Sequence, residues 1–409
     1  MTRSHELRTF SREILKLDIQ QRVPPEGVGL QERFPIVQWR RFDEMKIGAR
    51  IIAPVVLILL LLHLSCEDKG TEPIVVKNPR NYSWSVDTFY FPYIQQTMLT
   101  TVWGSSSQNV YVTGSTSGGG APLAYRFDGS KWNSVILPGP QGLGVKFEIS
   151  QIFGLSASDI YAVGVEYFFN PAPPPLYLDS SLVLHFDAAS WKQISLPQRG
   201  GNLTRIWGVS ASNIYVAGGK ALWHFDGSVW TKDTIPRMTS AGSWSGISGL
   251  SGSGGGQLFL TYVYRPEEAE PTELYYFVHW TMGSWSFLDS AIVEPTNVQL
   301  RWGYADLWTN PSGIMYSSSY GIHVWQDQAW SKVYDSQVPL NRIWGTDNNN
   351  IFAVGNLGTV LNYNGIDWFQ FDQFQNQNVL YTGVWTDGKE VFVAGHTVGG
   401  AKSIILHGR

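Results

Sequence analysis

The stretch that decides the fold is Arg205-Ile-Trp-Gly-Val-Ser-Ala-Ser-Asn-Ile-Tyr-Val-Ala-Gly218, followed by Ala221-Leu-Trp-His-Phe-Asp-Gly-Ser-Val-Trp230. It holds three short runs in which apolar and polar residues alternate, the period of a β-strand, and a fourth run begins at Trp230. The Asp226-Gly227 pair between the third and fourth runs favours a two-residue hairpin, because Asp and Gly tolerate positive φ. The stretch therefore predicts one antiparallel sheet of four strands.

The same unit recurs along the chain from about residue 97 to the C-terminus. Copies of its first half stand at Trp103-Gly104, Phe153-Gly154 and Trp344-Gly345, with weaker copies at Ser248-Gly249, Trp308-Thr309 and Trp385-Thr386. Six intervals separate Trp103 from Trp385, so the period averages about 47 residues. A repeat of this length that holds four strands is typical of a β-propeller blade.

The last repeat stops after its third strand, at Ile404–Arg409. Near the start of the repeat region, Trp84-Ser85-Val86 resembles the beginning of a fourth strand such as Trp230-Thr231-Lys232. We expect this N-terminal strand to complete the last sheet, which closes the ring and hides its edges. The sequence thus predicts an all-β fold, a seven-bladed β-propeller of four-stranded blades over residues 81–409.

The repeat Trp-Gly…Val-Tyr-Ala-Val-Gly…His-Phe-Asp-Gly…Trp resembles that of secreted bacterial propeller proteins, most of which have no assigned function. It is also distantly similar to the Asp-box turns of sialidase-like propellers. In the Asp box the aspartate and the aromatic are five residues apart, whereas Asp226 and Trp230 are four apart. The resemblance covers residues 81–409. It implies the propeller architecture and does not imply an activity.

The chain before the repeats carries signals for export. Residues 51–64 are nearly all apolar and follow Lys46 and Arg50. As a helix they would reach about 21 Å, short of the roughly 30 Å hydrocarbon core. Leu64-Ser65-Cys66 then resembles the lipobox of bacterial lipoproteins, in which the cysteine is lipidated, although His63 stands where that family usually has Leu. The alternative is a short membrane anchor with an incidental cysteine.

From this resemblance we expect a lipoprotein signal peptide at 45–65, lipidation of Cys66 and a tether over 66–80. Met45 opens a normal signal sequence, so residues 1–44 are predicted to be a disordered upstream extension from a mis-assigned start codon. The protein would lie in the bacterial cell envelope, held to the outer membrane by its lipid, on the periplasmic or the surface side.

Composition excludes several classes of protein. Of the 409 residues, 15% are charged and 14% aromatic, which excludes a disordered chain and a coiled coil. With a net charge of −4, the chain lacks the excess of basic residues that is typical of nucleic-acid-binding proteins. The single cysteine excludes a disulfide framework and a Cys-rich metal site. We expect no metal, no cofactor and a monomer.

The residues that recur in every copy are predicted to be structural. Tryptophans such as Trp103, Trp207 and Trp344 are expected to pack between blades, because a position filled by symmetry is first a packing position. One slot of the third strand holds a histidine in four copies, at His185, His224, His279 and His407. With one per blade, these side chains cannot converge on a single metal ion.

Function is expected where the repeat is broken. The links between strands one and two, and between three and four, are short in every copy, so we call the face that they share the plain face. The links between strands two and three and between blades vary, and they share the opposite, variable face. Its longest link, residues 165–177, carries four aromatic candidates for ligand binding: Tyr167, Phe168, Phe169 and Tyr177. The alternative is a lid that folds over its own blade.

The position two residues before each strand-one aromatic also varies. Our candidates at this position are Gln151, Arg205, Asp306 and Arg342. If they face the mouth of the central channel, the arginines are suited to a carboxylate or a hydroxyl-rich ligand, through forked guanidinium hydrogen bonds. Alternatively, these charged groups pair with one another across the channel.

Two functions remain open. The first is a non-catalytic, membrane-anchored lipoprotein whose variable face binds a glycan, a peptide or a partner protein. The alternative is a sialidase-like glycoside hydrolase or lyase that acts on extracellular polysaccharide, which needs two carboxylates about 5–9 Å apart. Asp306 with Arg205 and Arg342 is the nearest set, and Glu267-Glu268 lies on an insertion, so no catalytic residue is assigned.

Overall fold

The computed structural model describes residues 78–117, 123–139, 146–172, 177–198, 200–236, 244–253, 256–265, 273–281, 283–293 and 300–409. They belong to one compact unit that runs from Ile74 to Arg409. The predicted extension (1–44), the signal peptide (45–65), Cys66 and the tether up to residue 77 lie outside the described residues. Within the described ranges, neither short helix has the length or apolar character needed to cross a bilayer.

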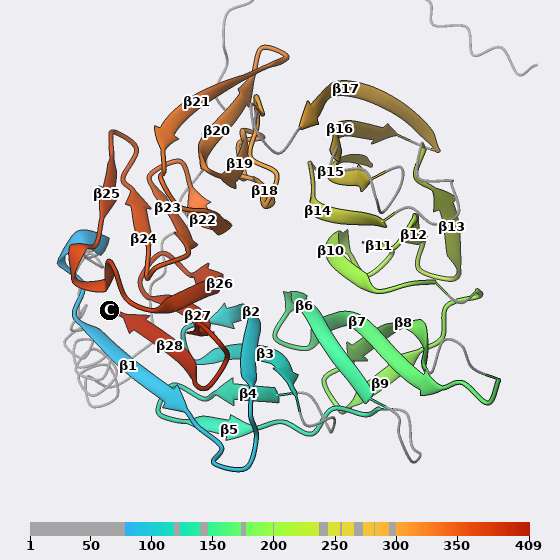
Figure 1. Cartoon of the computed structure of the whole chain (residues 1–409), viewed down its shortest axis with the longest axis horizontal. Helices are drawn as coiled ribbons and strands as arrows, with labels where there is room; N and C mark the ends of the chain where they lie inside the picture. The colour runs from blue at the N-terminus through green and yellow to red at the C-terminus, as the bar shows by residue number, and fades with distance from the viewer. Residues whose placement is uncertain are drawn as a thin grey trace, which may run out of the picture. The chain divides into compact units, whose positions relative to one another are not determined.

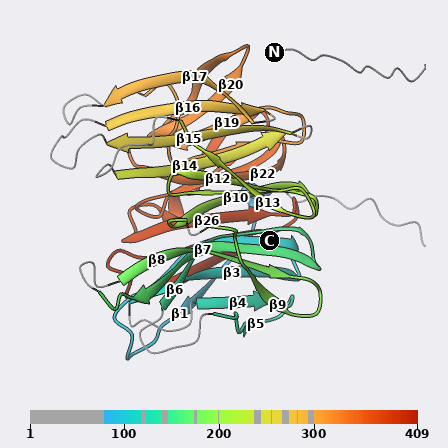
Figure 2. The same cartoon turned by 90° about the vertical axis from the view of Figure 1, so that its right-hand side faces the viewer.

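The strands form seven antiparallel sheets of four strands each, which confirms the predicted seven-bladed propeller. The sheets surround a central axis (Figure 1), and the first strands of neighbouring blades contact one another around the whole ring. Each blade is ordered from its first strand at the axis to its fourth at the rim. A view across the axis shows the strands running from one face of the ring to the other (Figure 2).

Among the first three blades, blade 2 has the longest first, second and third strands. Blade 1 holds β2 (Thr97–Ser106), β3 (Asn109–Thr116), β4 (Leu123–Phe127) and β5 (Trp132–Ser134). Blade 2 holds β6 (Lys146–Ser156), β7 (Asp159–Phe169), β8 (Tyr177–Phe186) and β9 (Trp191–Ile194). Blade 3 holds β10 (Leu203–Ser210), β11 (Asn213–Gly218), β12 (Ala221–Phe225) and β13 (Trp230–Thr234).

The next blades vary more. Blade 4 holds β14 (Trp244–Ser253), β15 (Gln257–Arg265), β16 (Glu273–Thr281) and β17 (Ser284–Val293). Blade 5 holds β18 (Asp306–Thr309), β19 (Met315–Ser319), β20 (Gly321–Gln326) and β21 (Ala329–Asp335). Blade 6 holds β22 (Leu340–Asp347), β23 (Asn350–Gly355), β24 (Val360–Tyr363) and β25 (Trp368–Gln370), followed by the 3-10 turn η2 (Asp372–Phe374). Blade 7 takes β26 (Val379–Thr386), β27 (Val391–Thr397) and β28 (Ser403–Gly408) from the C-terminus.

The fourth strand of blade 7 comes from the other end of the chain. Strand β1 (Trp84–Phe89) pairs with β28 in antiparallel register, from Trp84 opposite Gly408 to Phe89 opposite Ser403. The predicted closure is therefore confirmed. The 3-10 turn η1 (Pro79–Asn81) precedes β1, and Arg80 forms an ion pair of 2.9 Å with Asp367 of blade 6. The last residues of the predicted tether thus already contact the propeller.

The Trp-Gly pairs of the repeat form the contact between neighbouring blades. A Cβ on Gly154 would lie 2.4 Å from the ring of Trp103 in the preceding blade. A Cβ on Gly345 would lie 3.1 Å from the ring of Trp308 in the same way. Trp207 lies against Gly252 of blade 4 in the same way, so each of these indoles rests on bare backbone of the next blade, where any larger residue would collide. This confirms the packing role predicted for Trp103 and Trp207.

A β-bulge in the first strand adds a second contact between blades. The bulge places a polar residue opposite the backbone of the next blade, where its side chain donates to a carbonyl oxygen. Such bonds join Thr100 to Ile149 at 2.9 Å, Thr204 to Ile247 at 2.9 Å, Asn341 to Tyr381 at 2.9 Å and Thr382 to Leu99 at 2.7 Å. The last of these bonds joins blade 7 to blade 1, so polar side chains also hold the ring closed.

The repeated histidines have structural partners within their own blades. His224 stacks on Tyr215 of the neighbouring strand, with ring centroids 4.3 Å apart, and its Nε2 lies 2.9 Å from the Asn213 side-chain oxygen. His185 makes the equivalent contacts, stacking on Tyr161 and lying 2.7 Å from Asp159. His279 and His407 likewise stack on Phe259 and Phe392, so in four blades the histidine supports the second strand from the third, which confirms that this slot is structural.

Candidate functional site

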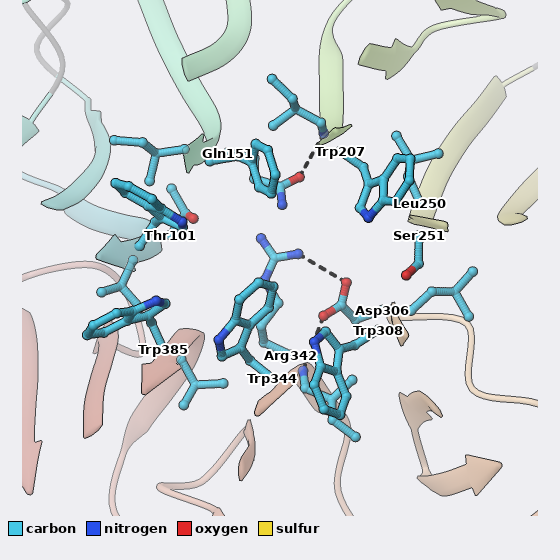
Figure 3. Close-up of a pocket in the computed structure, with 18 of the residues that line it drawn as sticks. Thr101, Gln151, Trp207, Leu250, Ser251, Asp306, Trp308, Arg342, Trp344 and Trp385 are labelled. Atoms are coloured by element: carbon cyan, nitrogen blue, oxygen red, sulfur yellow. Dashed lines mark hydrogen bonds and ion pairs between the residues drawn. The ribbon is translucent and has the colours of Figure 1, made fainter. Parts of the chain in front are cut away.

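The first strands of all seven blades surround a small central cavity (Figure 3). Its volume is about 100 Å³, which holds several water molecules and little more. Its walls include the indoles of Trp103, Trp207, Trp308, Trp344 and Trp385. The Trp-Gly packing between blades therefore narrows the channel as well as holding the ring together.

Arg342 and Asp306 meet inside this cavity. The Arg342 guanidinium reaches towards the middle of the surrounding side chains and lies 3.1 Å from the Asp306 carboxylate (Figure 3). The second carboxylate oxygen accepts from the backbone N–H of Ile343, also at 3.1 Å. Both charged side chains are buried, so their pairing offsets part of the cost of removing them from water.

Gln151 plays the equivalent role in another blade. Its side-chain oxygen accepts from the backbone N–H of Ile206 in the next blade, at 3.0 Å. Asp306 stands at the same repeat position and bonds Ile343 of the blade that follows it. At this position, an acceptor side chain thus satisfies a backbone donor of the neighbouring blade.

Arg205 spans three blades and is held by backbone oxygens. It donates to the carbonyls of Thr204 in its own blade, Ser248 in blade 4 and Ala305 in blade 5, at 2.8–3.1 Å. Burial lowers the pKa of Arg205 to about 10; the positive charge of Arg342 lowers it further, and Asp306 opposes the shift. Each of the three nitrogens of this guanidinium donates a hydrogen bond to a backbone carbonyl. Arg205 therefore links blades 3, 4 and 5 and is not positioned to bind a ligand.

Three of the four candidates, Gln151, Asp306 and Arg342, line the central cavity, whereas Arg205 is not among its lining residues. All four are bonded to the protein itself. Arg342 pairs with Asp306, as in the second of the two interpretations of the sequence. Among the described residues that line the cavity, Asp306 is the only carboxylate. Glu267 and Glu268 lie outside the described residues, but the base of their insertion is held by the Arg265–Glu273 ion pair.

The aromatic candidates of blade 2 lie on strands and not on a loop. Strands β7 and β8 continue beyond the length expected from the repeat, so Tyr167 pairs with Asp179, Phe168 with Leu178 and Phe169 with Tyr177. The prediction of a long link over 165–177 was wrong at its two ends, because β7 continues through the β-prone run up to Phe169 and β8 begins at Tyr177. This hairpin projects at the variable end of the blade.

At the tip of this hairpin, apolar side chains are exposed. Phe169 is 55% exposed and meets Tyr177 edge to face, with ring centroids 6.3 Å apart, while Tyr167 and Phe168 are half-buried. Burial raises the pKa of Tyr167, with the nearby Glu148 and Asp179 adding to the shift. The two residues at the tip are therefore available to a partner, and the two behind them anchor the hairpin.

Neighbouring blades add further exposed apolar residues on the same face. Tyr90 and Tyr93 lie on the link from β1 to β2, and Ile136 follows β5; Tyr93 is 99% and Ile136 91% exposed. With Phe169, Tyr177 and Leu178 they occupy three consecutive blades, 7, 1 and 2. We call these six residues the apolar arc: Tyr90, Tyr93, Ile136, Phe169, Tyr177 and Leu178. On the plain face, the exposed large apolar residues of the described ranges are Val209, Val229 and Ile366, none of them aromatic.

Blade 5 contains a second cavity, of about 310 Å³, that no sequence prediction indicated. It is lined by Leu300, Trp302, Tyr304, Ser319, Tyr320, His323 and Lys332. One signal could have indicated it, because His323 stands in a slot that is apolar in the other six copies of the repeat.

Comparisons with known proteins identify the fold and no family. No model of a protein family matches the chain, and no curated protein matches it. Among solved structures, YCF48 bound to a D1 peptide is similar over 82% of this chain and 96% of its own, with a TM-score of 0.52 and 15% sequence identity. The computationally designed Ika8 protein matches 76% of this chain and 97% of its own, with a TM-score of 0.46 and 11% identity. At these identities, the likeness to YCF48 shows the propeller fold alone.

Proposed function

We propose that this chain is a lipid-anchored, non-catalytic binding protein that holds a polypeptide partner against its variable face. The observation that carries the proposal is the apolar arc, which exposes aromatic and aliphatic side chains on three consecutive blades. Exposed apolar groups gathered on one face mark interaction surfaces, and Tyr and Phe are enriched at the centres of protein interfaces.

The construction of blade 2 supports this proposal. Phe169 and Tyr177 sit at the end of a hairpin whose strands are paired up to the tip, so little conformational entropy is lost when a partner binds. Among solved propellers of similar fold, YCF48 is seen bound to a peptide, which is compatible with a polypeptide ligand here. A polypeptide is favoured over a glycan at the arc because four of its six exposed side chains are Tyr or Phe, the other two are Ile and Leu, and none of the six is charged.

The anchor is the second half of the proposal. The single cysteine of the chain, Cys66, follows a short apolar segment and precedes the propeller. A lipid on Cys66 would hold the folded unit at the outer membrane of a bacterial cell envelope, since two or more acyl chains give stable anchoring. Twelve residues, 67–78, lie between Cys66 and the 3-10 turn that begins at Pro79, and they would form most of the tether.

The test is selection of peptides from a random phage-displayed library on purified residues 74–409. We expect the wild type to enrich peptides with apolar residues, and the double variant Phe169→Ser, Tyr177→Ser to lose at least tenfold in affinity for them. The matched control is Val209→Ser, Ile366→Ser, which removes exposed apolar residues from the plain face. Equal enrichment by the arc variant and the wild type would overturn the proposal.

The glycan alternative is tested on the same samples with a glycan array. Binding of oligosaccharides that is lost in the arc variant would replace a polypeptide with a glycan at this surface. No specific observation favours the glycoside hydrolase. The one carboxylate among the described residues of the central cavity, Asp306, is already engaged by Arg342 and by the backbone of Ile343.

A further inference from the structure

Blade 5 departs from the repeat at its first strand. Strand β18 has four residues, whereas the first strands of the other six blades have between eight and eleven. The segment before it, from Leu300 to Ala305, runs beside β19 without joining the sheet in regular register. It is held by two bonds, from the Gly303 N–H to the Ser317 hydroxyl and from the Ala305 N–H to the Ser318 carbonyl, both 2.9 Å.

Polar residues replace apolar ones in the core of this blade. His323 occupies the third-strand slot that precedes the repeated histidine position, and the strand registers give its six counterparts: Tyr125, Leu184, Trp223, Val278, Leu361 and Leu406. Its partner on the second strand is Ser317, where the other blades have Val112, Ala162, Val216, Leu260, Ala353 and Val393. An apolar pair that is present in six blades has become His and Ser in one.

These changes surround the cavity of about 310 Å³, which is at the small end of the range of ligand pockets. One wall is aromatic and apolar, made by Leu300, Trp302 and Tyr304 from the segment before β18. The cavity is also lined by Ser319, His323 and Lys332 from β19, β20 and β21, and the Lys332 ammonium forms an ion pair of 2.8 Å with Asp335. Tyr320 stands in the turn between β19 and β20, half exposed on the variable face.

Several polar atoms at this cavity have no partner within the described part of the chain. His323 is 5% exposed and its buried Nδ1 forms no hydrogen bond, and the same is true of the indole Nε1 of Trp302, which is 1% exposed. Buried polar groups are almost always hydrogen-bonded, and leaving one unbonded destabilises the folded state. An apolar residue at position 323 would avoid this cost. Stability of the fold therefore does not account for the histidine, whereas binding of a ligand would.

We propose that the cavity of blade 5 binds one neutral saccharide unit, with its ring against Trp302 and Tyr304 and its hydroxyls bonded to His323, Ser319 and Lys332. Aromatic side chains offer an apolar face to the C–H groups of a sugar ring. A neutral imidazole offers one donor and one acceptor, which matches hydroxyl groups that do both. Burial lowers the pKa of His323 to about 4, so the ring is neutral at physiological pH.

This site goes beyond the proposed function and is separate from it. The apolar arc lies on blades 7, 1 and 2, whereas this cavity belongs to blade 5, and no residue is shared between them. Loss of polypeptide binding at the arc and loss of saccharide binding in blade 5 are therefore distinguishable by the variants that cause them.

The test measures binding of saccharides to residues 74–409 by saturation-transfer-difference NMR and titration. The probes are the methyl glycosides of glucose, galactose and N-acetylglucosamine, each also presented at the end of an oligosaccharide, and N-acetyltyrosinamide as a probe for a peptide side chain. His323→Leu restores the residue that blades 2, 6 and 7 carry at this slot, so it is expected to fold with an increased melting temperature. Lys332→Ala has a matched control in Lys232→Ala, because Lys232 holds the same register position in blade 3.

We expect at least one glycoside to bind the wild type and the Lys232→Ala control, and its Kd to rise at least tenfold in His323→Leu and in Lys332→Ala. Binding of the free methyl glycoside would indicate a site for a single sugar, and binding of the oligosaccharide alone would indicate a glycan terminus; both support the proposal. Affinity unchanged by His323→Leu, no binding of any saccharide, or binding of N-acetyltyrosinamide alone would overturn it.

Discussion

Trp385 of the last blade lies against Gly104 of the first, so closely that a Cβ on Gly104 would be 2.8 Å from the indole ring. The two residues are at opposite ends of the repeat region, and their contact closes the ring through side-chain packing. The same relationship joins Trp103 to Gly154 and Trp308 to Gly345. This packing accounts for the Trp-Gly pair of blade 1. Its tryptophan packs against blade 2, and the tryptophan of blade 7 packs against its glycine.

Gly104→Ala should therefore destabilise the propeller. The added methyl group collides with the indole of Trp385, which is 5% exposed, and overpacking of this kind costs about 1–3 kcal/mol. Urea unfolding of residues 74–409 measures the loss. In a Trp385→Leu background, the same change should cost less, because the colliding ring is gone. Equal costs in the two backgrounds would show that the contact does not determine the choice of glycine.

Removal of residues 78–92 should open the ring. The deletion takes away β1, whose six residues pair with β28, and the bond of 3.0 Å from the Trp132 indole to Asp87. Each backbone hydrogen bond contributes about 1 kcal/mol, so the loss should amount to several kcal/mol. We expect a lower melting temperature and self-association through the edge of β28. A chain that starts at residue 74 is the control, and a deletion variant as stable as this control would contradict closure by β1.

The number of blades, their four strands and the closure by Trp84–Phe89 could be predicted from the sequence, because all three depend on a pattern that repeats. The sequence predicts a loop for the hairpin of blade 2, because its prolines indicate irregular chain and the run Tyr167-Phe168-Phe169 lacks the apolar–polar alternation of a strand. The inter-blade bonds of Thr100 and Thr382 were also missed, because they arise from bulges that alternation alone does not reveal.

The candidate site was predictable only in part. Position within the repeat located Gln151, Asp306 and Arg342 at the axis, but whether charged groups there pair or stay free depends on distances across blades. The repeat motif does not indicate the cavity of blade 5, because its signal, His323, becomes visible only when this residue is aligned with its apolar counterparts in the other blades. Comparison of that slot across the copies would have shown one polar residue among six apolar ones, which is a signal that the sequence does contain.

Asp306→Asn should destabilise the protein more than removal of the whole pair does. The asparagine would leave the buried guanidinium of Arg342 without a counter-charge, close to Arg205, and breaking a buried ion pair from one side costs roughly 3–5 kcal/mol. The double variant Asp306→Leu, Arg342→Leu leaves no unpaired charge. Urea unfolding should therefore rank the double variant above the single one, and the opposite order would contradict the account of Arg342 as a paired, structural residue.

Cys66→Ser should release the full-length protein from membranes, if the proposed anchor is correct. The cysteine thiol carries the lipid in this proposal, and a serine cannot be lipidated in its place. Fractionation of cells followed by immunoblotting measures the distribution, and expression from Met45 serves as the control for the upstream residues 1–44. Retention of the serine variant in the membrane fraction would argue for a hydrophobic anchor instead.

Stability should fall as the pH is lowered through the range from about 6.5 to about 4, in part because of His323. Burial lowers the pKa of this residue to about 4; the charge of Lys332 lowers it further, and Asp335 opposes the shift. In the unfolded chain a histidine has a pKa of about 6.5, so between these values the unfolded state binds a proton that the folded state does not. Because of His323 alone, the free energy of unfolding should be about 2 kcal/mol lower at pH 5 than at pH 7.5.

The variant His323→Leu lacks this group, whereas His224, His279 and His396, whose pKa values are also lowered by burial, are common to both proteins. The difference in unfolding free energy between His323→Leu and the wild type should therefore grow by about 2 kcal/mol from pH 7.5 to pH 5. A difference that stays constant over this range would mean that His323 titrates normally in the folded protein, and that water reaches its ring.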